Sequence, residues 1–224
     1  MPGRKSPMTR GFFITIDGGD GAGKSLQARR LEESLRADGV PVLLCRDPGS
    51  TRLGEAVREI LLGRREMQIC AQSEMLLFMA ARAEMVHETI LPALEDDGVV
   101  IADRFLLSTL VYQGIAGGLP LDEIMRVGQV TVQGRFPDLT ILLDLPAEVG
   151  MARINRPLDR IEQKGIAFHK KVEAGYREAL DFLAKESGTA PLKIDAAQDP
   201  GRIAAQIYEA VIRRLPLSVK GKRE

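Results

Sequence analysis

The sequence predicts an α/β fold in which a parallel five-stranded sheet carries helices on both faces. Five short apolar runs, rich in branched residues, do not alternate with polar positions, which is typical of strands covered on both faces. Stretches with helical periodicity separate these runs, and strands that alternate with helices pair in parallel through right-handed crossovers. The predicted strands are Phe12–Ile16, Pro41–Cys45, Val99–Asp103, Thr140–Leu145 and Pro191–Ala196.

The helices between the strands are predicted from the spacing of their apolar residues. In the first helix Ala28, Leu31 and Leu35 fall on one face, and Gly39 is placed to end it. Ligands of such sheets bind beyond the carboxyl ends of the strands, where Asp17, Asp47, Asp103 and Asp144 lie. Further helices are predicted at Ser73–Leu94, Leu121–Gly134, Phe168–Lys185 and Gly201–Leu215.

Length and composition favour one domain with a core of its own. The chain has 224 residues, and we expect a single domain at 11–216 with flexible tails at 1–10 and 217–224. Lys+Arg and Asp+Glu both number 31, which argues against a broad basic surface for nucleic acid. No segment resembles a membrane anchor, so we expect a cytoplasmic protein. Cys45 and Cys70 are interpreted as two buried thiols in a reducing compartment.

One loop has the composition of a phosphate-binding site. Residues 18–25 read GGDGAGKS and match the pattern G-x-x-x-x-G-K-[ST], with a predicted strand before them and a helix after them. Glycines let successive N–H groups turn inward around a phosphate, and the positive end of the following helix adds to the field. In this pattern the lysine reaches the outer phosphates and the serine hydroxyl a magnesium ion. The sequence therefore predicts a nucleoside triphosphate site at Gly18, Gly19, Asp20, Gly21, Ala22, Gly23, Lys24 and Ser25.

Other features narrow the class of triphosphate-binding protein. A switch GTPase needs a guanine-reading N-K-x-D, but the single asparagine of the chain, Asn155, is followed by Arg-Pro. A small phosphotransferase needs arginines on several segments and a lid that excludes water. The segment MARINRPLDRIE offers such a lid. Its charge mixture alone is typical of an exposed, salt-bridged helix face, whereas Pro157 interrupts helical continuity.

From about Phe12 to Leu215 the chain resembles the thymidylate kinase (dTMP kinase) family of P-loop nucleoside monophosphate kinases. The resemblance is carried by FITIDGGDGAGKS, RDPGST, MLLFMAARAEMV, DRFLLSTLVYQG, FPDLTILLDL and LDRIE, in that order. It implies phosphorylation of dTMP to dTDP with ATP and Mg²⁺, and a homodimer. Two alternatives remain: a kinase of another small acceptor, and a nucleotide-dependent switch or scaffold whose output is binding.

The resemblance also assigns an acceptor site. Phe78 and Arg82 share a helix face, and from periodicity alone Phe78 is expected in the core. The family instead uses these positions for stacking on the base and for binding the base or phosphate. Asp47 and Ser50 depart from the family's Glu-Pro-Gly-Gly, and Phe105 stands where tyrosine or histidine is common. The implied dTMP-binding residues are Asp47, Pro48, Arg58, Phe78, Arg82, Arg104, Ser108, Thr109, Tyr112 and Gln113.

The remaining assignments concern catalysis, the metal and the lid. Gly21 stands where one class of the family carries a catalytic arginine, so the resemblance implies the bacterial type, with the arginine in the lid. Among Arg153, Arg156 and Arg160 we prefer Arg156, and we expect it to act with Lys24, Arg104 and Asp20. Magnesium is expected at Ser25 and at Asp20 or Asp103. Ala197 and Gln198 are expected beside adenine, and His87 and His169 are interpreted as ordinary helix residues.

Overall fold

The computed structural model of the chain describes residues 11–63, 67–216 and 219. The predicted tails 1–10 and 217–224 lie outside these residues, apart from Val219, whose side chain is buried in the core. Every described residue of the predicted domain 11–216 belongs to one sheet with its helices and connecting loops.

The predicted parallel five-stranded sheet is confirmed, with the strand order β2-β3-β1-β4-β5. All four pairings are parallel, and in the register Ile16 of β1 lies opposite Asp103 of β3 and Gly18 opposite Leu143 of β4. The connection that leaves β1 runs toward one edge of the sheet, to β2, and the connection that leaves β3 runs toward the other, to β4. Ligands of open α/β sheets bind at such a switch point. The strands are β1 (Phe12–Gly18), β2 (Val42–Arg46), β3 (Val99–Asp103), β4 (Leu139–Asp144) and β5 (Ala190–Asp195).

The prediction that all five strands are covered on both faces is wrong for the two edges. Strands β1 and β3 are buried throughout, and β4 almost so, whereas β2 is mostly half-buried and β5 exposes every second residue. Pro191 and Lys193 are two of these exposed residues of β5. An edge strand has a neighbour on one side only, so a branched apolar run does not by itself separate edge strands from central ones.

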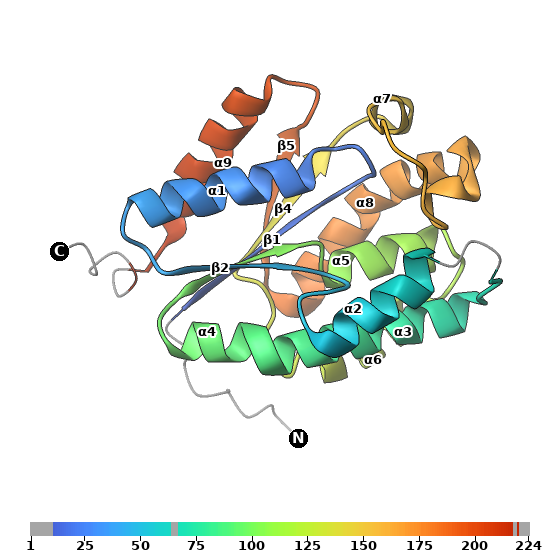
Figure 1. Cartoon of the computed structure of the whole chain (residues 1–224), viewed down its shortest axis with the longest axis horizontal. Coiled ribbons are helices and arrows are strands. Elements are labelled where there is room, and N and C mark those ends of the chain that lie inside the picture. The colour runs from blue at the N-terminus through green and yellow to red at the C-terminus, as the bar shows by residue number, and fades with distance from the viewer. Residues whose placement is uncertain (1–10, 64–66, 217–218, 220–224) are drawn as a thin grey trace.

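Two helical layers enclose the sheet (Figure 1). Alternate residues of β1 serve the two sides: Phe12, Ile14 and Ile16 pack in the core beneath α1 and α9, and Phe13 packs in the core beneath the other helices. The helices are α1 (Lys24–Ala37), α2 (Arg52–Arg58), α3 (Ala71–Met85), α4 (Leu91–Glu95), α5 (Leu106–Thr109), α6 (Leu121–Thr131), α7 (Ala147–Ala152), α8 (Ile166–Ser187) and α9 (Pro200–Arg214).

Short turns of wider or tighter helix join several of these elements. The helix predicted at Ser73–Leu94 is a continuous stretch in which a π-helical turn separates α3 from α4. Pro92 has no N–H to donate to the preceding turn, and the backbone ahead of it is wound more widely. The joining turns are η1 (Glu59–Gly63), η2 (Val86–Ile90), η3 (Leu110–Ile115) and η4 (Glu162–Lys164).

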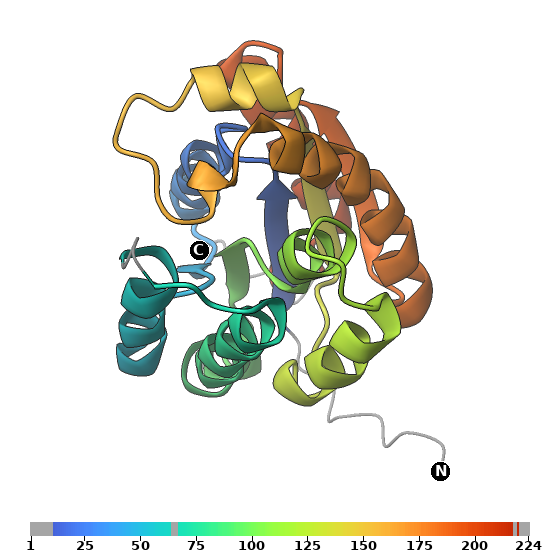
Figure 2. The same ribbon diagram turned by 90° about the vertical axis from the view of Figure 1, so that its right-hand side faces the viewer.

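The lid was predicted at Met151–Glu162; most of this stretch falls in the segment between α7 and α8, residues 153–165, which is called the lid from here on. Figure 2 shows it arching away from α7 and coming down beside α2 and α3. Arg160 fixes this approach, because it donates to the carbonyl oxygen of Leu61 in η1 at 2.7 Å and to a carboxylate oxygen of Glu74 in α3 at 2.5 Å. The lid therefore joins the end of α7 to η1 and α3.

Both cysteines are free thiols, but only one is buried. Cys45 lies in β2 beneath the helices, whereas Cys70 is exposed where α3 begins, so the prediction of two buried thiols is wrong for Cys70. Its neighbours Gln72 and Ser73 are polar and exposed, and Cys70 faces solvent with them at the N-cap of α3. In the described part of the chain, no helix is both long enough and apolar enough to cross a membrane.

Candidate active site

The loop of residues 18–25 joins β1 to α1 at the carboxyl edge of the sheet. Gly23 precedes the helix with a φ of 87°, a conformation that glycine adopts without strain. Lys24 is buried and donates its Nζ to the carbonyl oxygen of Gly19 at 2.6 Å. Burial, and then the charge of Arg104, lower the pKa of Lys24 from its ordinary 10.5 to about 8. The Lys24 ammonium is thus held inside the loop, where a bound phosphate would accept its hydrogen bonds and favour its charged form.

Gly21 belongs to a close backbone contact between this loop and α7. A Cβ atom at Gly21 would lie 1.9 Å from the carbonyl oxygen of Gly150, and one at Gly150 would lie 2.2 Å from the carbonyl oxygen of Asp20. Gly21 also has a φ of 74°. Two glycines are needed for the loop to lie against the helix that leads into the lid, and an arginine at position 21 has no room in this arrangement.

Ser25 and Asp103 bring two side-chain oxygen atoms together in the lining of the pocket. The Ser25 hydroxyl donates to the Asp103 carboxylate over 2.5 Å, beside Lys24 and at the end of β3. Hydroxyl and carboxylate oxygens suit Mg²⁺, which is held by one or two protein ligands together with phosphates and water. Among the described residues, no three His, Cys, Asp or Glu side chains form a group able to hold a metal on their own. The donor set therefore fits magnesium brought in with a triphosphate.

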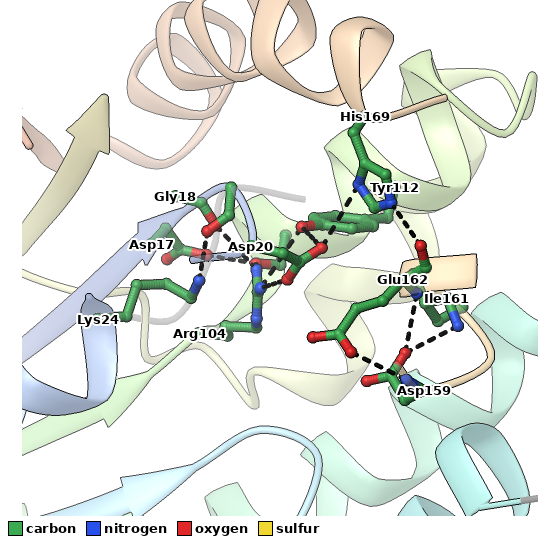
Figure 3. Close-up of polar contacts among 12 residues, drawn as sticks. Asp17, Gly18, Asp20, Lys24, Arg104, Tyr112, Asp159, Ile161, Glu162 and His169 are labelled. Atoms are coloured by element: carbon green, nitrogen blue, oxygen red, sulfur yellow. Dashed lines mark hydrogen bonds and ion pairs between the residues drawn. The ribbon is translucent and has the colours of Figure 1, made fainter. Parts of the chain in front are cut away.

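Arg104 is the most heavily constrained cation of the site. It follows β3 with a φ of 70°, a conformation uncommon outside glycine and frequent at functional positions. Its Nη1 donates to the carbonyl oxygen of Gly18 at 3.0 Å, the Ser108 hydroxyl at 3.1 Å and the Tyr176 hydroxyl at 3.0 Å. Its Nη2 lies 2.5 Å from Asp20 (Figure 3). These contacts fix a guanidinium beside the phosphate loop.

The carboxylate of Asp20 links the phosphate loop to the helices above it. Besides the bond from Arg104 it accepts one from the Tyr112 hydroxyl at 2.8 Å, and Nδ1 of His169 lies 3.6 Å away (Figure 3). Burial raises the pKa of Asp20, but the charges of Arg104 and Lys24 outweigh it, so the pKa lies below its ordinary value. Asp20 is therefore ionised and directed toward Arg104.

The opposite wall of the pocket is built around a buried ion pair. Arg82 is 1 % exposed and donates its Nε to Asp47 at 2.6 Å, while its Nη2 donates to the Thr109 hydroxyl at 2.8 Å. Arg58 donates to the carbonyl oxygen of Pro48 at 2.9 Å. Asp47 thus holds Arg82 in one orientation, which brings segments 47–48, 58 and 82 to one side of the cavity.

The three lid arginines have different partners. Arg153 donates to the carbonyl oxygen of Ala196 at 3.1 Å, and Arg160 is held at Leu61 and Glu74. Arg156 makes a two-pronged contact with Glu162 of the lid itself, at 2.8 and 2.6 Å, and its side chain is 57 % exposed. Only Arg153 and Arg156 of the three line the pocket. Arg160 instead fastens the lid to α3.

These groups surround a pocket of about 530 Å³, a volume within the usual range for small-molecule sites. Most of the predicted residues line it, Phe78 among them, which is half-buried rather than in the core. Predicted residues that do not line it are Gly18, Gly19, Ala22, Arg160, Ala197 and Gln198. Lining residues that were not among the assigned site residues include Leu26, Arg46, Leu62, Phe105, Ile154, Asp159, Ile161 and Glu162.

Some residues around the site were missed altogether. His87 in η2 and His169 in α8 both lie in helices, as predicted, but the contacts of His169 with the site were not predicted. Its side chain is 3 % exposed and its Nε2 lies 3.0 Å from the carbonyl oxygen of Glu162, so it connects the lid with Asp20 (Figure 3). Tyr176 and Glu74 were missed too. The one available signal for Glu74 was an acid placed directly before the apolar helix run MLLFMAAR.

The glycine-rich loop between β1 and α1, the arginines on the facing wall and the segment 153–165 beside them fit a P-loop kinase that acts on a small phosphorylated acceptor. Residues 16–207 match the family model described as thymidylate kinase. The chain is 36 % identical over 214 residues to a thymidylate kinase of Halalkalibacterium halodurans, covering 94 % of this chain and 100 % of the relative. It is 42 % identical to one from Caldanaerobacter subterraneus (90 % and 95 % covered) and 40 % identical to one from Caulobacter vibrioides (94 % and 100 % covered). The chain belongs to the thymidylate kinase family.

Proposed function

We propose that the pocket described above carries out the phosphorylation of dTMP to dTDP by ATP, the reaction of the thymidylate kinase family. The observation that carries the assignment is the convergence on one cavity of the phosphate-loop Lys24, the strand-end Arg104 and the buried Asp47–Arg82 pair. With the donor phosphates at Lys24 and the acceptor nucleotide at the Asp47–Arg82 pair, Arg104 lies between the two reacting phosphates.

The donor half holds ATP. The backbone N–H groups of the phosphate loop and Lys24 bind the β- and γ-phosphates, and Lys24 exchanges its bond to Gly19 for phosphate oxygens. Arg153 and the loop at Ala197 and Gln198 lie on the adenine side, where Arg153 already contacts the carbonyl oxygen of Ala196. Ser25 and Asp103 are the residues that would hold Mg²⁺, which would supply positive charge for the phosphates of ATP. The bonds of Asp20 to Arg104 and Tyr112 favour a role beside the acceptor over one as a metal ligand.

The acceptor half holds dTMP. Phe78 stacks on the base, while Arg82, Thr109 and Gln113 face its edge and Tyr112 lies beside the sugar; all five line the pocket. Arg58 and Arg104 contact the phosphate, whose oxygen attacks the γ-phosphoryl group in line. The protein's task is positioning and stabilisation of charge on the transferred group.

The lid completes the site. Arg156 is bound to Glu162 and remains largely exposed at the pocket, so it is the lid arginine free to exchange partners. On closure its two-pronged guanidinium moves from the Glu162 carboxylate to the transferred phosphoryl group. Closure also removes water that would otherwise hydrolyse ATP.

The proposal is tested by ADP release with Mg-ATP and dTMP, dUMP, dCMP or dGMP as acceptor. We expect dTMP to give the highest kcat/KM and to exceed dUMP by roughly 10–100-fold, because one methyl group in a fitted pocket is worth about 1–3 kcal/mol. A switch or scaffold would release no stoichiometric ADP in response to dTMP. A kinase of another acceptor would favour a different monophosphate.

The same proposal includes a homodimer, a single catalytic domain at 11–216 and a cytoplasmic location, where ATP is available. Leu76 of α3 and Val130 of α6 are 53 % and 75 % exposed on neighbouring helices, which supports pairing through this side. Sedimentation of the wild-type protein and of Val130→Lys tests it. We expect a dimer that the substitution weakens, and a monomeric wild-type protein would contradict the proposal.

A further inference from the structure

Glu74 is a buried acid that lies behind the base side of the pocket. Its side chain is 3 % exposed, and it lies in α3 among apolar residues without lining the cavity. Three groups meet its carboxylate: Nε2 of Gln113 at 2.8 Å, Nη2 of Arg160 at 2.5 Å and Nζ of Lys164 at 3.2 Å. Gln113 does line the cavity. Glu74 therefore contacts the pocket through one side chain and the lid through two.

The carboxylate of Glu74 is ionised in this setting. Burial raises its pKa, but the bonds from Gln113 and Arg160 and the charge of Lys164 outweigh burial, so the pKa lies below its ordinary value. An ionised carboxylate only accepts hydrogen bonds, and the NH₂ group is the only donor of a glutamine amide. The orientation of the Gln113 amide is therefore dictated by chemistry, with Nε2 toward Glu74.

This orientation fixes what Gln113 offers to a ligand. The two amide atoms diverge from one carbon, so once Nε2 is bound to Glu74, Oε1 is the atom available to the pocket. Arg82 lines the same cavity. Four of its five N–H groups are bound to Asp47, Met79, Phe105 and Thr109, which leaves one N–H on Nη1 as a donor. The base side of the pocket thus offers the amide oxygen of Gln113, from η3, as an acceptor and an N–H group of Arg82, from α3, as a donor.

We propose that Glu74 is a positioning residue that sets the hydrogen-bonding polarity of the base site, by holding the Gln113 amide with its oxygen toward the pocket. Such a site accepts a base with a ring N–H next to a carbonyl, as in thymine and uracil. Cytosine presents the reverse pair, a ring acceptor next to an amino donor, and leaves the oxygen of Gln113 facing a lone pair. The inference rests on the proposed function, because it concerns how the same site chooses its acceptor.

The test is Glu74→Gln, with dissociation constants for dTMP, dUMP and dCMP measured by calorimetry or competition. The new amide can donate to Oε1 of Gln113 and turn the Gln113 NH₂ group toward the pocket. We expect the affinities for dTMP and dUMP to fall together by about tenfold while that for dCMP does not fall, so the dTMP:dCMP ratio falls at least tenfold. The dTMP:dUMP ratio stays constant, since both bases carry the same N–H and carbonyl.

Arg160→Met is the matched control. It removes one cation from Glu74 but leaves the bond to Gln113 and the charge of Lys164, so we expect the dTMP:dCMP ratio to stay within about threefold of wild type. In a Gln113→Ala background, Glu74→Gln should change the ratio no further, because the two residues act through one contact. If Glu74→Gln alone fails to fold, Glu74→Gln/Arg160→Met removes both charges, and the same fall in the ratio is expected from it.

Three results would overturn the inference: an unchanged dTMP:dCMP ratio in Glu74→Gln, an equal loss of affinity for all three nucleotides, and a fall in Arg160→Met as large as in Glu74→Gln. The last would assign discrimination to docking of the lid. Failure of the proposed function gives a different result, because the wild-type protein would then not bind dTMP in preference to other monophosphates.

Discussion

At the scale of single residues, two cations are held beside the phosphate loop by groups of the protein itself. Lys24 lies in the phosphate loop with a lowered pKa, and its nearest partner is a neutral carbonyl oxygen, that of Gly19. Arg104 is bound to Asp20 and to two tyrosine hydroxyls. Both cations are fixed before any phosphate arrives, and fixed charges stabilise developing charge without reorganisation.

Lys24→Ala should keep the fold and lose phosphoryl transfer. The ammonium lies where negative charge accumulates on the transferred group, so we expect kcat to fall by about 10²–10³ or more. The measurement is steady-state ADP release, with circular dichroism to show that the sheet remains. Near-native turnover would show that residues 18–25 do not bind the donor in the assigned manner.

The lowered pKa of Lys24 predicts a pH dependence. Because kcat/KM reports the free enzyme, kcat/KM for ATP should fall as pH rises through about 8, where Lys24 loses its proton. Bound triphosphate favours the charged form, so ATP binding near pH 8 should take up protons. Calorimetry in buffers of different ionisation enthalpy measures this uptake, and proton release or no change would contradict the assignment.

At the scale of elements, the three arginines of the lid contact three different parts of the protein. Arg153 joins it to the loop after β5, Arg160 fastens it to η1 and α3, and Arg156 stays at the pocket on Glu162. Glu162 in turn lies under His169 of α8, which approaches Asp20 of the phosphate loop (Figure 3). The lid is therefore connected both to the phosphate loop and to α3.

Arg156→Ala should lower kcat strongly and leave dTMP affinity almost unchanged. A contact made only in the transition state affects the chemical step, whereas a ground-state contact also raises KM. Arg156→Lys should restore little, because a point charge does not reproduce a planar two-pronged donor. Arg153→Ala serves as comparison in the same kinetic measurement. If Arg153 gave the large kcat effect and Arg156 none, the transferred charge would be neutralised from the adenine side.

The contact between the phosphate loop and α7 gives a second prediction at this scale. Gly150→Ala places a Cβ 2.2 Å from the carbonyl oxygen of Asp20, so either the loop or α7 must move. We expect a loss of about 1–3 kcal/mol in the free energy of unfolding and a raised KM for ATP. Gly63→Ala is the control, since its Cβ would meet its nearest atom at 3.5 Å. Equal stability of the two variants would show that the close approach is not needed.

The sequence predicts elements better than it predicts contacts between them. Strand and helix positions follow from local periodicity, and the phosphate loop from a local pattern, so these agree with the structure to within a residue or two at most strand ends. The contacts Glu74–Gln113 and His169–Asp20 join elements distant in the chain. No local pattern encodes which face of one helix meets another, so these residues read as ordinary core or surface positions.

At the scale of the whole molecule, the active site lies where the two helical layers meet the carboxyl edge of the sheet. The donor loop begins α1 in one layer, whereas Phe78, Arg82 and Gln113 belong to α3 and η3 in the other. Figure 1 shows these helices on opposite sides of the strands. The two substrates, bound together, therefore contact both helical layers, which the protein itself joins through the sheet and the lid.

This arrangement predicts how ligands change thermal stability. A ligand that binds only the folded state at 100 times its Kd adds about 2.7 kcal/mol, which for a domain of this size raises Tm by roughly 5–10 °C. We expect ATP and dTMP each to raise Tm in the wild-type protein. In Lys24→Ala the shift with ATP should shrink while that with dTMP persists, because the acceptor wall of Asp47 and Arg82 does not involve the loop. Thermal scans with each nucleotide make the measurement, and loss of the dTMP shift in this variant would show that the two halves of the pocket do not bind independently.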